Sequence, residues 1–219
     1  MSITAIVGSI VLMVAGLGVW DSLYSSYQDV YNNEFCYKYI GQVYGESYNN
    51  LSRKFNSFDV QFAQSETADF SFHGIEKSGS LLVLDSGDKI RIFDAKSKKK
   101  IRIEKDEVAI ASQLAEQLVV KVGDKIAYKT ESSLNEHRVT VTAIVDAKIP
   151  QGIFIYKDKV KNFEPNTIYI GDSEAYEQAK KVESISNIIS IKKQDCFYLD
   201  IPRPSASIIC LKTLPVKTC

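Results

Sequence analysis

An apolar run of eighteen residues opens the chain. Between residues 3 and 20 no side chain is charged, and only Thr4 and Ser9 are polar. A helix rises about 1.5 Å per residue, so this run is just long enough to cross a hydrocarbon core of roughly 30 Å. Because a backbone in lipid must satisfy its own hydrogen bonds, we expect a membrane-spanning helix. The rest of the chain then lies on one side of the membrane, which we take to be the outside.

Two alternatives stay open for this run. A cleaved signal peptide is the first, although such a leader needs basic residues and no Lys or Arg precedes Lys38. A helix buried in a globular core is the second. The missing basic flank also leaves the orientation of a membrane helix unsupported, because Lys and Arg flanks set that orientation.

The helical pattern continues past residue 20. Apolar residues recur at helical spacing at Trp20, Leu23, Tyr24, Tyr27, Val30 and Tyr31. This spacing predicts an amphipathic stalk that extends the membrane helix to about Asn33, so that residues 1–33 form one transmembrane and stalk unit. A separate juxtamembrane helix packed on the following domain is the alternative.

From residue 34 onward the hydrophobic period changes from helical to alternating. Short helices are predicted near residues 51–55, 111–118 and 174–182. Strands are predicted at residues 35–44, 58–62, 70–72, 80–84, 89–93, 125–130, 138–145, 152–156, 167–170 and 185–191. We expect residues 80–84 and 89–93 to form a hairpin around the turn Asp85-Ser86-Gly87-Asp88. The predicted fold class is α+β: a long N-terminal transmembrane and stalk helix followed by a mixed β-sheet domain over residues 34–193.

The last segment of the chain has neither period. Residues 194–219 contain three of the five prolines, Pro202, Pro204 and Pro215. The longest apolar patch there, residues 208–211, is too short to span a bilayer. We predict an irregular tail outside the core.

Composition excludes one class of partner. The 219 residues carry 27 basic and 27 acidic side chains, so the formal net charge is zero. A nucleic-acid partner would require a basic excess, and we expect none. The 22 Tyr and Phe residues favour a sheet-rich domain, because aromatic side chains suit half-buried strands.

No catalytic, cofactor-binding or metal-binding residues are predicted. The two histidines, His73 and His137, each fall in a strand-like run, where a lone histidine is usually structural. Acidic pairs such as Asp146 and Asp158 lack the spacing of a metal site or a glycosidase site. The cysteines Cys36, Cys196, Cys210 and Cys219 show neither metal-ligand nor redox spacing, and their pairing stays open. We therefore expect a protein that is not an enzyme.

One charge run stands out. The cations are Lys96, Lys98, Lys99, Lys100 and Arg102. A solvated hairpin tip is the simpler interpretation, because such runs prefer water. Contact with anionic lipid headgroups or with an acidic partner is the sharper one.

Three stretches carry a resemblance to a known family. Residues 7–10 and 14–23, with their small-residue end and Asp21-Ser22 exit, are similar to the membrane helix that opens a permease unit. Residues 107–126, with Leu114-Ala115-Glu116 and a Gly123-Asp124 turn, resemble a strand–helix–strand element of an extracytoplasmic domain. Residues 139–145 and 152–156 resemble the strands that follow. In this order, over about residues 2–193, the chain resembles the FtsX-like (MacB-type) family of ABC transporter permeases.

The resemblance implies a transport or mechanical role without chemistry in the outer domain. A separate cytoplasmic ABC ATPase subunit would hydrolyse ATP, and membrane helices would carry the motion outward. The implied partners are membrane lipid, the ATPase and further permease helices. The chain lacks the later membrane helices and the basic cytoplasmic segment of the family, so we expect a truncated fragment. The resemblance implies a single-pass protein of the cell membrane whose main domain is extracytoplasmic. A membrane-tethered binding module is the alternative, and an anchored hydrolase is a third interpretation.

Overall fold

A computed structural model describes residues 8, 11–22, 34–103, 105, 107–148 and 150–191. Residues 11–22 are helical. Among the residues described, the structure contains no helix that is both long enough and apolar enough to cross a membrane. Much of the predicted transmembrane and stalk unit, residues 1–33, and all of the predicted tail, residues 194–219, lie outside the described residues.

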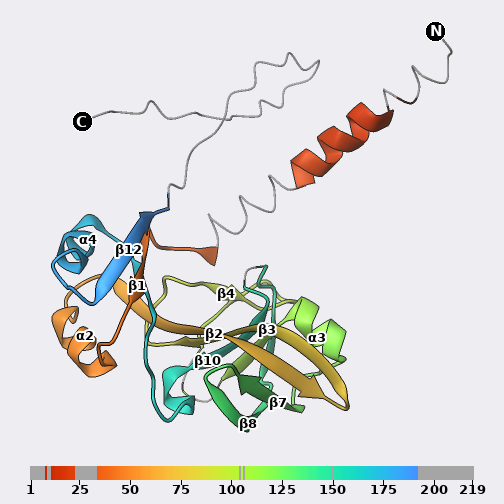
Figure 1. Ribbon diagram of the computed structural model, residues 1–219. Helices are drawn as coiled ribbons and strands as arrows, with labels where there is room; N and C mark the ends of the chain where they lie inside the picture. Colours follow the sequence, from red (N-terminus) through yellow and green to blue (C-terminus); the bar gives the residue numbers. More distant parts are fainter. Residues whose placement is uncertain are drawn as a thin grey trace.

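The folded domain is built on one large mixed sheet (Figure 1). Its strands run in the order β12-β1-β11-β2-β3-β10-β6-β9, with β7 paired to β2 and β8 paired to β7. β10 pairs in parallel with β3, and β6 with β9, while the other pairs are antiparallel. The α+β class predicted for this domain is confirmed.

The bounds of the elements follow the chain. The helices are α2 (Tyr48–Lys54), α3 (Ser112–Leu118), α4 (Ser173–Ala179) and the 3-10 helix η2 (Lys157–Lys159). The strands are β1 (Tyr39–Val43), β2 (Val60–Phe72), β3 (Ile75–Leu84), β4 (Ile92–Phe93), β5 (Lys100–Ile101), β6 (Val108–Ala111), β7 (Lys125–Thr130), β8 (Ser133–Thr140), β9 (Ala143–Val145), β10 (Gly152–Tyr156), β11 (Thr167–Ile170) and β12 (Ile185–Ser190).

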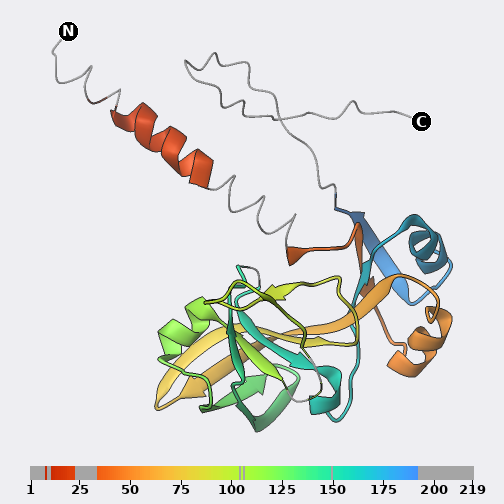
Figure 2. The ribbon, with the colours of Figure 1, turned by 180° about the vertical axis from the view of Figure 1, so that it is seen from behind.

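The long strand β2 joins the two ends of the domain. Its first residues pair with β11, and its later residues pair with β3 on one side and β7 on the other. One end of the domain packs α2 and α4 around Leu51 and Ile168, whereas the other packs α3 around Phe70 and Ile126 (Figures 1 and 2). A third cluster, which includes Phe154, completes the core.

The chain enters and leaves the described domain at the same place. Residues 34–36 pair with residues 89–91: the Cys36 amide donates to the Lys89 carbonyl at 2.7 Å, and Arg91 returns a bond to Glu34 at 2.7 Å. The last strand, β12, lies antiparallel to β1, and the Ile191 amide donates to the Lys38 carbonyl at 2.7 Å. Residues 38 and 191 are therefore neighbours.

The predicted strand–helix–strand block at residues 107–130 is confirmed as β6, α3 and β7. Leu114 and Leu118 face the same core cluster, as their spacing of four residues predicts. Gly123 takes φ of +98° in the reversal before β7, a conformation that favours glycine. The predicted strands at β10, β11 and β12 and the predicted helix at α4 are also confirmed, with bounds that differ by a few residues.

The predicted hairpin between residues 80–84 and 89–93 is wrong. β3 instead forms a hairpin with β2 through the His73-Gly74 turn, and its other edge pairs with β10. Buried Gln61 explains the difference, because its side-chain oxygen accepts the amides of Lys89 and Ile90 at 3.0 and 3.1 Å. These amides are thus satisfied away from β3, and β4 pairs with β5.

The predicted strand over residues 138–145 is interrupted. β8 ends at Thr140, and β9 begins at Ala143. Between them the Val141 amide donates to Asp124, and the Thr142 hydroxyl donates to the Val108 carbonyl at 3.0 Å. The chain therefore leaves β7, the partner of β8, and continues beside β6, the partner of β9. The first strand is also shorter than predicted, since β1 begins at Tyr39.

Candidate functional site

Each of the two histidines lies at an exposed position beside one aromatic ring. His73 lies in the β2–β3 turn at φ +47°, with its ring 4.1 Å from the Phe72 ring. His137 lies on β8 and stacks on Tyr128 of β7 at 5.3 Å between ring centres. Each ring therefore packs against an aromatic neighbour.

No metal cluster is present in the described part of the chain. No three His, Cys, Asp or Glu side chains there converge as a metal site requires. Asp146 bonds to Lys98, and Asp158 lies 3.8 Å from Lys105, so these two carboxylates face lysines and not each other. Cys36 forms no disulfide with any described residue, and the other three cysteines lie outside those residues.

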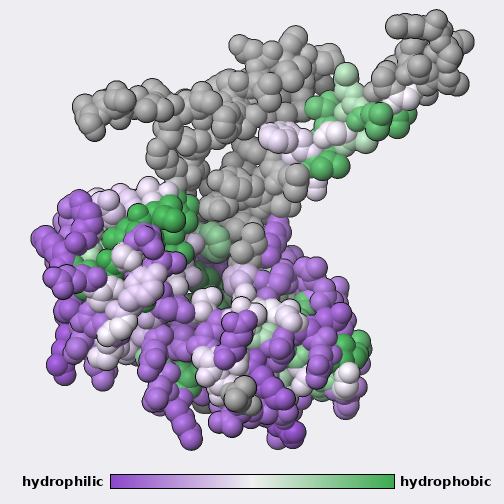
Figure 3. Space-filling model, viewed as in Figure 1, coloured by the Kyte–Doolittle hydropathy of each residue, from purple (hydrophilic) through white to green (hydrophobic). Residues whose placement is uncertain are grey.

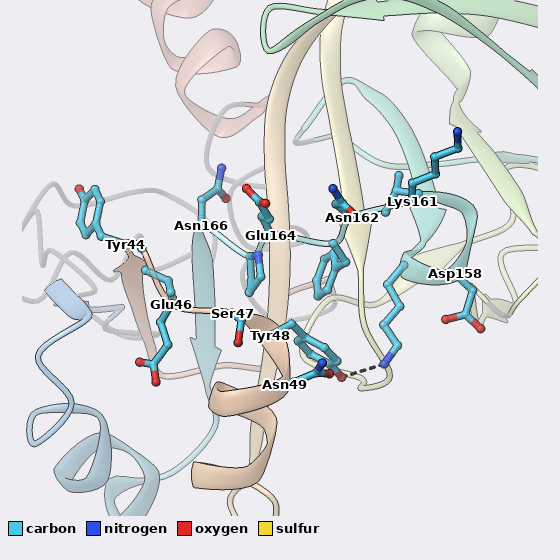
Figure 4. A pocket seen from close by; sticks show the side chains of 16 residues that line it. Tyr44, Glu46, Ser47, Tyr48, Asn49, Asp158, Lys161, Asn162, Glu164 and Asn166 are labelled. Atoms are coloured by element: carbon cyan, nitrogen blue, oxygen red, sulfur yellow. Dashed lines mark hydrogen bonds between the residues drawn. The ribbon is translucent and has the colours of Figure 1, made fainter.

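The candidate site is a groove of about 820 Å³ beside α2. It lies between the loop from β1 into α2 and the segment that runs from η2 toward β11 (Figure 4). Its walls carry aromatic, amide and charged side chains of both signs, namely Tyr44, Glu46, Tyr48, Asn49, Lys157, Asp158, Lys161, Asn162, Phe163, Glu164 and Asn166. Such a lining suits a polar ligand with an apolar face.

A contact between Tyr48 and Lys157 joins the two walls. The Lys157 ammonium donates to the Tyr48 hydroxyl at 2.8 Å and lies 4.3 Å from the centre of its ring (Figure 4). Phe163 meets the same ring edge-on at 5.0 Å. Tyr48 is the first residue of α2 and Lys157 the first of η2, so this contact links the two helices across the groove.

Asp85 lies beneath this contact and is almost fully buried, with 7% of its surface exposed. Its carboxylate accepts the Phe62 amide at 3.1 Å. Burial raises the pKa of Asp85 to about 7, although the Phe62 amide, the Lys157 charge and the Tyr48 hydroxyl oppose the rise. Asp85 therefore changes its charge near neutral pH.

The pKa values of Tyr48 and Lys157, which lie above Asp85, are raised as well. Burial raises the pKa of the Tyr48 hydroxyl, and the bond from Lys157 only partly offsets it. For Lys157, partial burial lowers the pKa, but the Tyr48 bond and the charges of Tyr48, Tyr156 and Asp85 together outweigh it and raise the pKa. Lys157 stays charged while Asp85 titrates below it.

The groove is lined by charged, amide and aromatic side chains. Among its lining residues there is no His and no Cys, so no nucleophile is paired with a histidine base there. Sequence reasoning missed the cluster because Tyr48, Asp85 and Lys157 are far apart along the chain. One signal was available, since Asp85 directly follows four apolar residues that are all buried in β3.

Comparisons with known proteins give structural neighbours only. No family model matches the chain, and no curated protein matches it. Among solved structures, the extracellular domain of the noncanonic ABC-type transporter YknZ from Gram-positive bacteria is similar with a TM-score of 0.47 and 9% identity, over 68% of this chain and 97% of that one. A domain of a Porphyromonas gingivalis protein assigned as a permease gives a TM-score of 0.39 and 10% identity, over 85% and 95%. Neither TM-score reaches 0.5.

Proposed function

We propose that this chain is the extracytoplasmic part of an FtsX-like ABC transporter permease, held to the cell membrane by its N-terminal helix. In this proposal residues 1–33 span the membrane once and form the stalk, residues 34–193 form the outer domain, and residues 194–219 form a separate tail. The outer domain transmits motion and catalyses no reaction.

The exposure of the N-terminal helix supports the membrane anchor of this proposal. Over residues 11–22 its apolar side chains lie uncovered, with Leu12 exposed to 75% and Met13 to 70% (Figure 3). Leaving such side chains in water costs about 1 to 2 kcal/mol each at this exposure. The exposed ones are Val11, Leu12, Met13, Val14, Leu17, Val19 and Trp20. Their sum, on the order of 10 kcal/mol, favours transfer of this helix to lipid.

The junction at the base of the domain supports the role in a permease. Because residues 38 and 191 are neighbours, the domain has its entry and exit side by side. That geometry suits a domain inserted between membrane segments, since it does not require the flanking chain to separate. The resemblance adds the partners: a cytoplasmic ABC ATPase subunit and further permease helices, with motion passed through the stalk.

The anchor is tested by placing charges in the helix. In the full chain, the double substitution of Leu12→Lys and Val14→Lys should move the protein from the carbonate-washed membrane pellet to the supernatant. Lysine near the centre of a membrane helix costs about 3 kcal/mol. Ile189→Lys, at an exposed apolar position of the domain, is the matched control and should stay in the pellet. A wild-type chain found in the supernatant refutes the anchor.

The groove favours one second candidate, a membrane-tethered binding module. Its volume of about 820 Å³ is that of a ligand site. Hydrogen exchange of the domain in native membranes separates the two functions. A coupled permease should change its exchange when ATP is added, whereas a tethered module should not respond to ATP.

A further inference from the structure

The lysine run forms the tip of a small hairpin whose shape is fixed. β4 and β5 pair, and the Asp94 carboxylate accepts the amides of Ser97 and Lys96 at 2.6 and 3.2 Å. The Lys98 amide donates to the Asp94 carbonyl at 3.0 Å, and Lys98 takes φ of +56°. The solvated hairpin tip predicted from the sequence is therefore present, and its lysines project from a defined turn.

Three of the five cations form no close ion pair among the described residues, although the charge of Lys96 contributes to the lowered pKa of nearby Asp94. Lys98 pairs with Asp146, and Lys100 lies 3.6 Å from Asp88. In contrast, the exposed side chains of Lys96, Lys99 and Arg102 form no ion pair within that part of the chain. The tip also carries none of the exposed large apolar side chains. It therefore presents positive charge and no large apolar side chain that could insert into a bilayer.

The hairpin is attached to the point where the chain enters the domain. Residues 89–91, which bond to residues 34–36, lead directly into β4 at Ile92. The other side of the hairpin is tied to β9, because the Ala95 amide donates to Ile144 at 3.0 Å and Asp146 donates to Phe93 at 2.8 Å. In both ribbon views β4 lies on the side of the sheet nearest the helix at residues 11–22 (Figures 1 and 2).

We propose that the β4–β5 hairpin binds the anionic lipid headgroups of the bilayer that holds the N-terminal helix, through Lys96, Lys99 and Arg102. This rests on the proposed membrane anchor. The tether keeps the hairpin near the bilayer at high effective concentration, an advantage that a diffusing acidic protein lacks. The net charge of the chain is zero, so the attraction is local to the hairpin.

The expected strength follows from the three cations that form no close ion pair, Lys96, Lys99 and Arg102. A Lys or Arg close to an anionic bilayer gains about fivefold in occupancy per charge, and the gain disappears beyond a Debye length of roughly 10 Å. Three cations together predict that the hairpin is bound most of the time at low salt and is released at about 0.5 M salt.

The test uses the full chain in two kinds of vesicle, phosphatidylcholine alone and phosphatidylcholine with about 30% phosphatidylglycerol. Flotation reports the anchor, and mass spectrometry reports the rate at which an acetylating reagent modifies each lysine. Phosphatidylglycerol should slow the modification of Lys96 and Lys99 about fivefold at low salt. Lys77 lies on β3 and Lys129 on β7, and both strands pair with the later part of β2. These two lysines should be acetylated at the same rate with either kind of vesicle.

A charge-reversal variant provides the control. Phosphatidylglycerol should also slow the modification of Lys98, which lies between Lys96 and Lys99 in the same turn. The triple substitution of Lys96→Glu, Lys99→Glu and Arg102→Glu should abolish this effect on Lys98, whereas Lys77→Glu with Lys129→Glu should preserve it. If the protein floats with the vesicles but Lys96 and Lys99 are acetylated at equal rates in both lipids, the proposed lipid contact is wrong and the anchor is still supported. Protein that fails to float refutes the anchor itself. Protection by soluble polyglutamate as strong as that by phosphatidylglycerol assigns the hairpin to an acidic protein instead.

Discussion

Asp85→Asn should make the domain more stable at alkaline pH and leave it unchanged in acid. Burial raises the pKa of this carboxyl from 3.8 to about 7. The folded protein therefore holds a proton that the unfolded chain has released, and stability falls as the pH rises from the ordinary pKa through about 7. Asparagine keeps an oxygen for the Phe62 amide and carries no charge at any pH.

The magnitude follows from the two pKa values. A pKa that rises from 3.8 to about 7 corresponds to about 4 kcal/mol of unfolding free energy lost once Asp85 is ionised in both states. Water penetration and relaxation reduce such figures, so we expect a gain of about 2 to 4 kcal/mol for Asp85→Asn at about pH 8. At about pH 4.5 wild type and variant should agree within about 1 kcal/mol.

The assay is urea unfolding of the full chain in detergent micelles, followed by circular dichroism across this pH range. The difference between wild type and variant isolates Asp85, because other titrating groups cancel. Asp88→Asn is the matched control on the same loop. Partial burial raises the pKa of Asp88, but Lys89, Lys100 and Arg91 outweigh it and lower the pKa, so its pH dependence has the opposite sign. If the difference in unfolding free energy between wild type and Asp85→Asn stays constant across this pH range, the reasoning is refuted.

Three further substitutions test the packing, each by its change in unfolding free energy. Val119→Gly should stabilise by about 0.5 to 1 kcal/mol, because this exposed β-branched residue sits at φ +60° after α3; Val122→Gly, exposed but without a positive φ, should destabilise. Gly152→Ala should cost about 3 kcal/mol, since its Cβ would lie 1.7 Å from a β3 carbonyl oxygen, and a neutral effect would contradict the β3–β10 register. Gln61→Ala should cost about 3 kcal/mol by leaving two loop amides without an acceptor, against less than about 1 kcal/mol for part-exposed Gln64→Ala.

Local patterns predicted the elements that pack with their sequence neighbours. The β6–α3–β7 block was predictable because Leu114 and Leu118 lie one helical turn apart and Gly123 marks the reversal. The predicted hairpin at residues 80–93 failed for a non-local reason. β3 is buried between β2 and β10, and Gln61 takes the amides that a hairpin would have used.

The candidate groove could not be predicted for the same reason. Lys157 reaches Tyr48 across 109 positions, and Asp85 comes from a third element. Nothing in the sequence pattern joins them, and the pattern placed Asp85 only in a turn. The exposure of the cation run could be predicted from the sequence, because a run of cations prefers water whatever fold surrounds it. Composition and periodicity thus predicted the fold class but not the site.

The central claim is that lipid holds the N-terminal helix while the domain lies outside the cell membrane. A reporter cysteine tests it directly: Glu131→Cys, at the exposed β7–β8 turn, in a chain whose four native cysteines are replaced by serine. In intact cells a membrane-impermeant maleimide should label this cysteine fully, and the labelled chain should stay in the carbonate-washed membrane pellet. Labelling that requires cell lysis, or a labelled chain in the supernatant, would contradict the account.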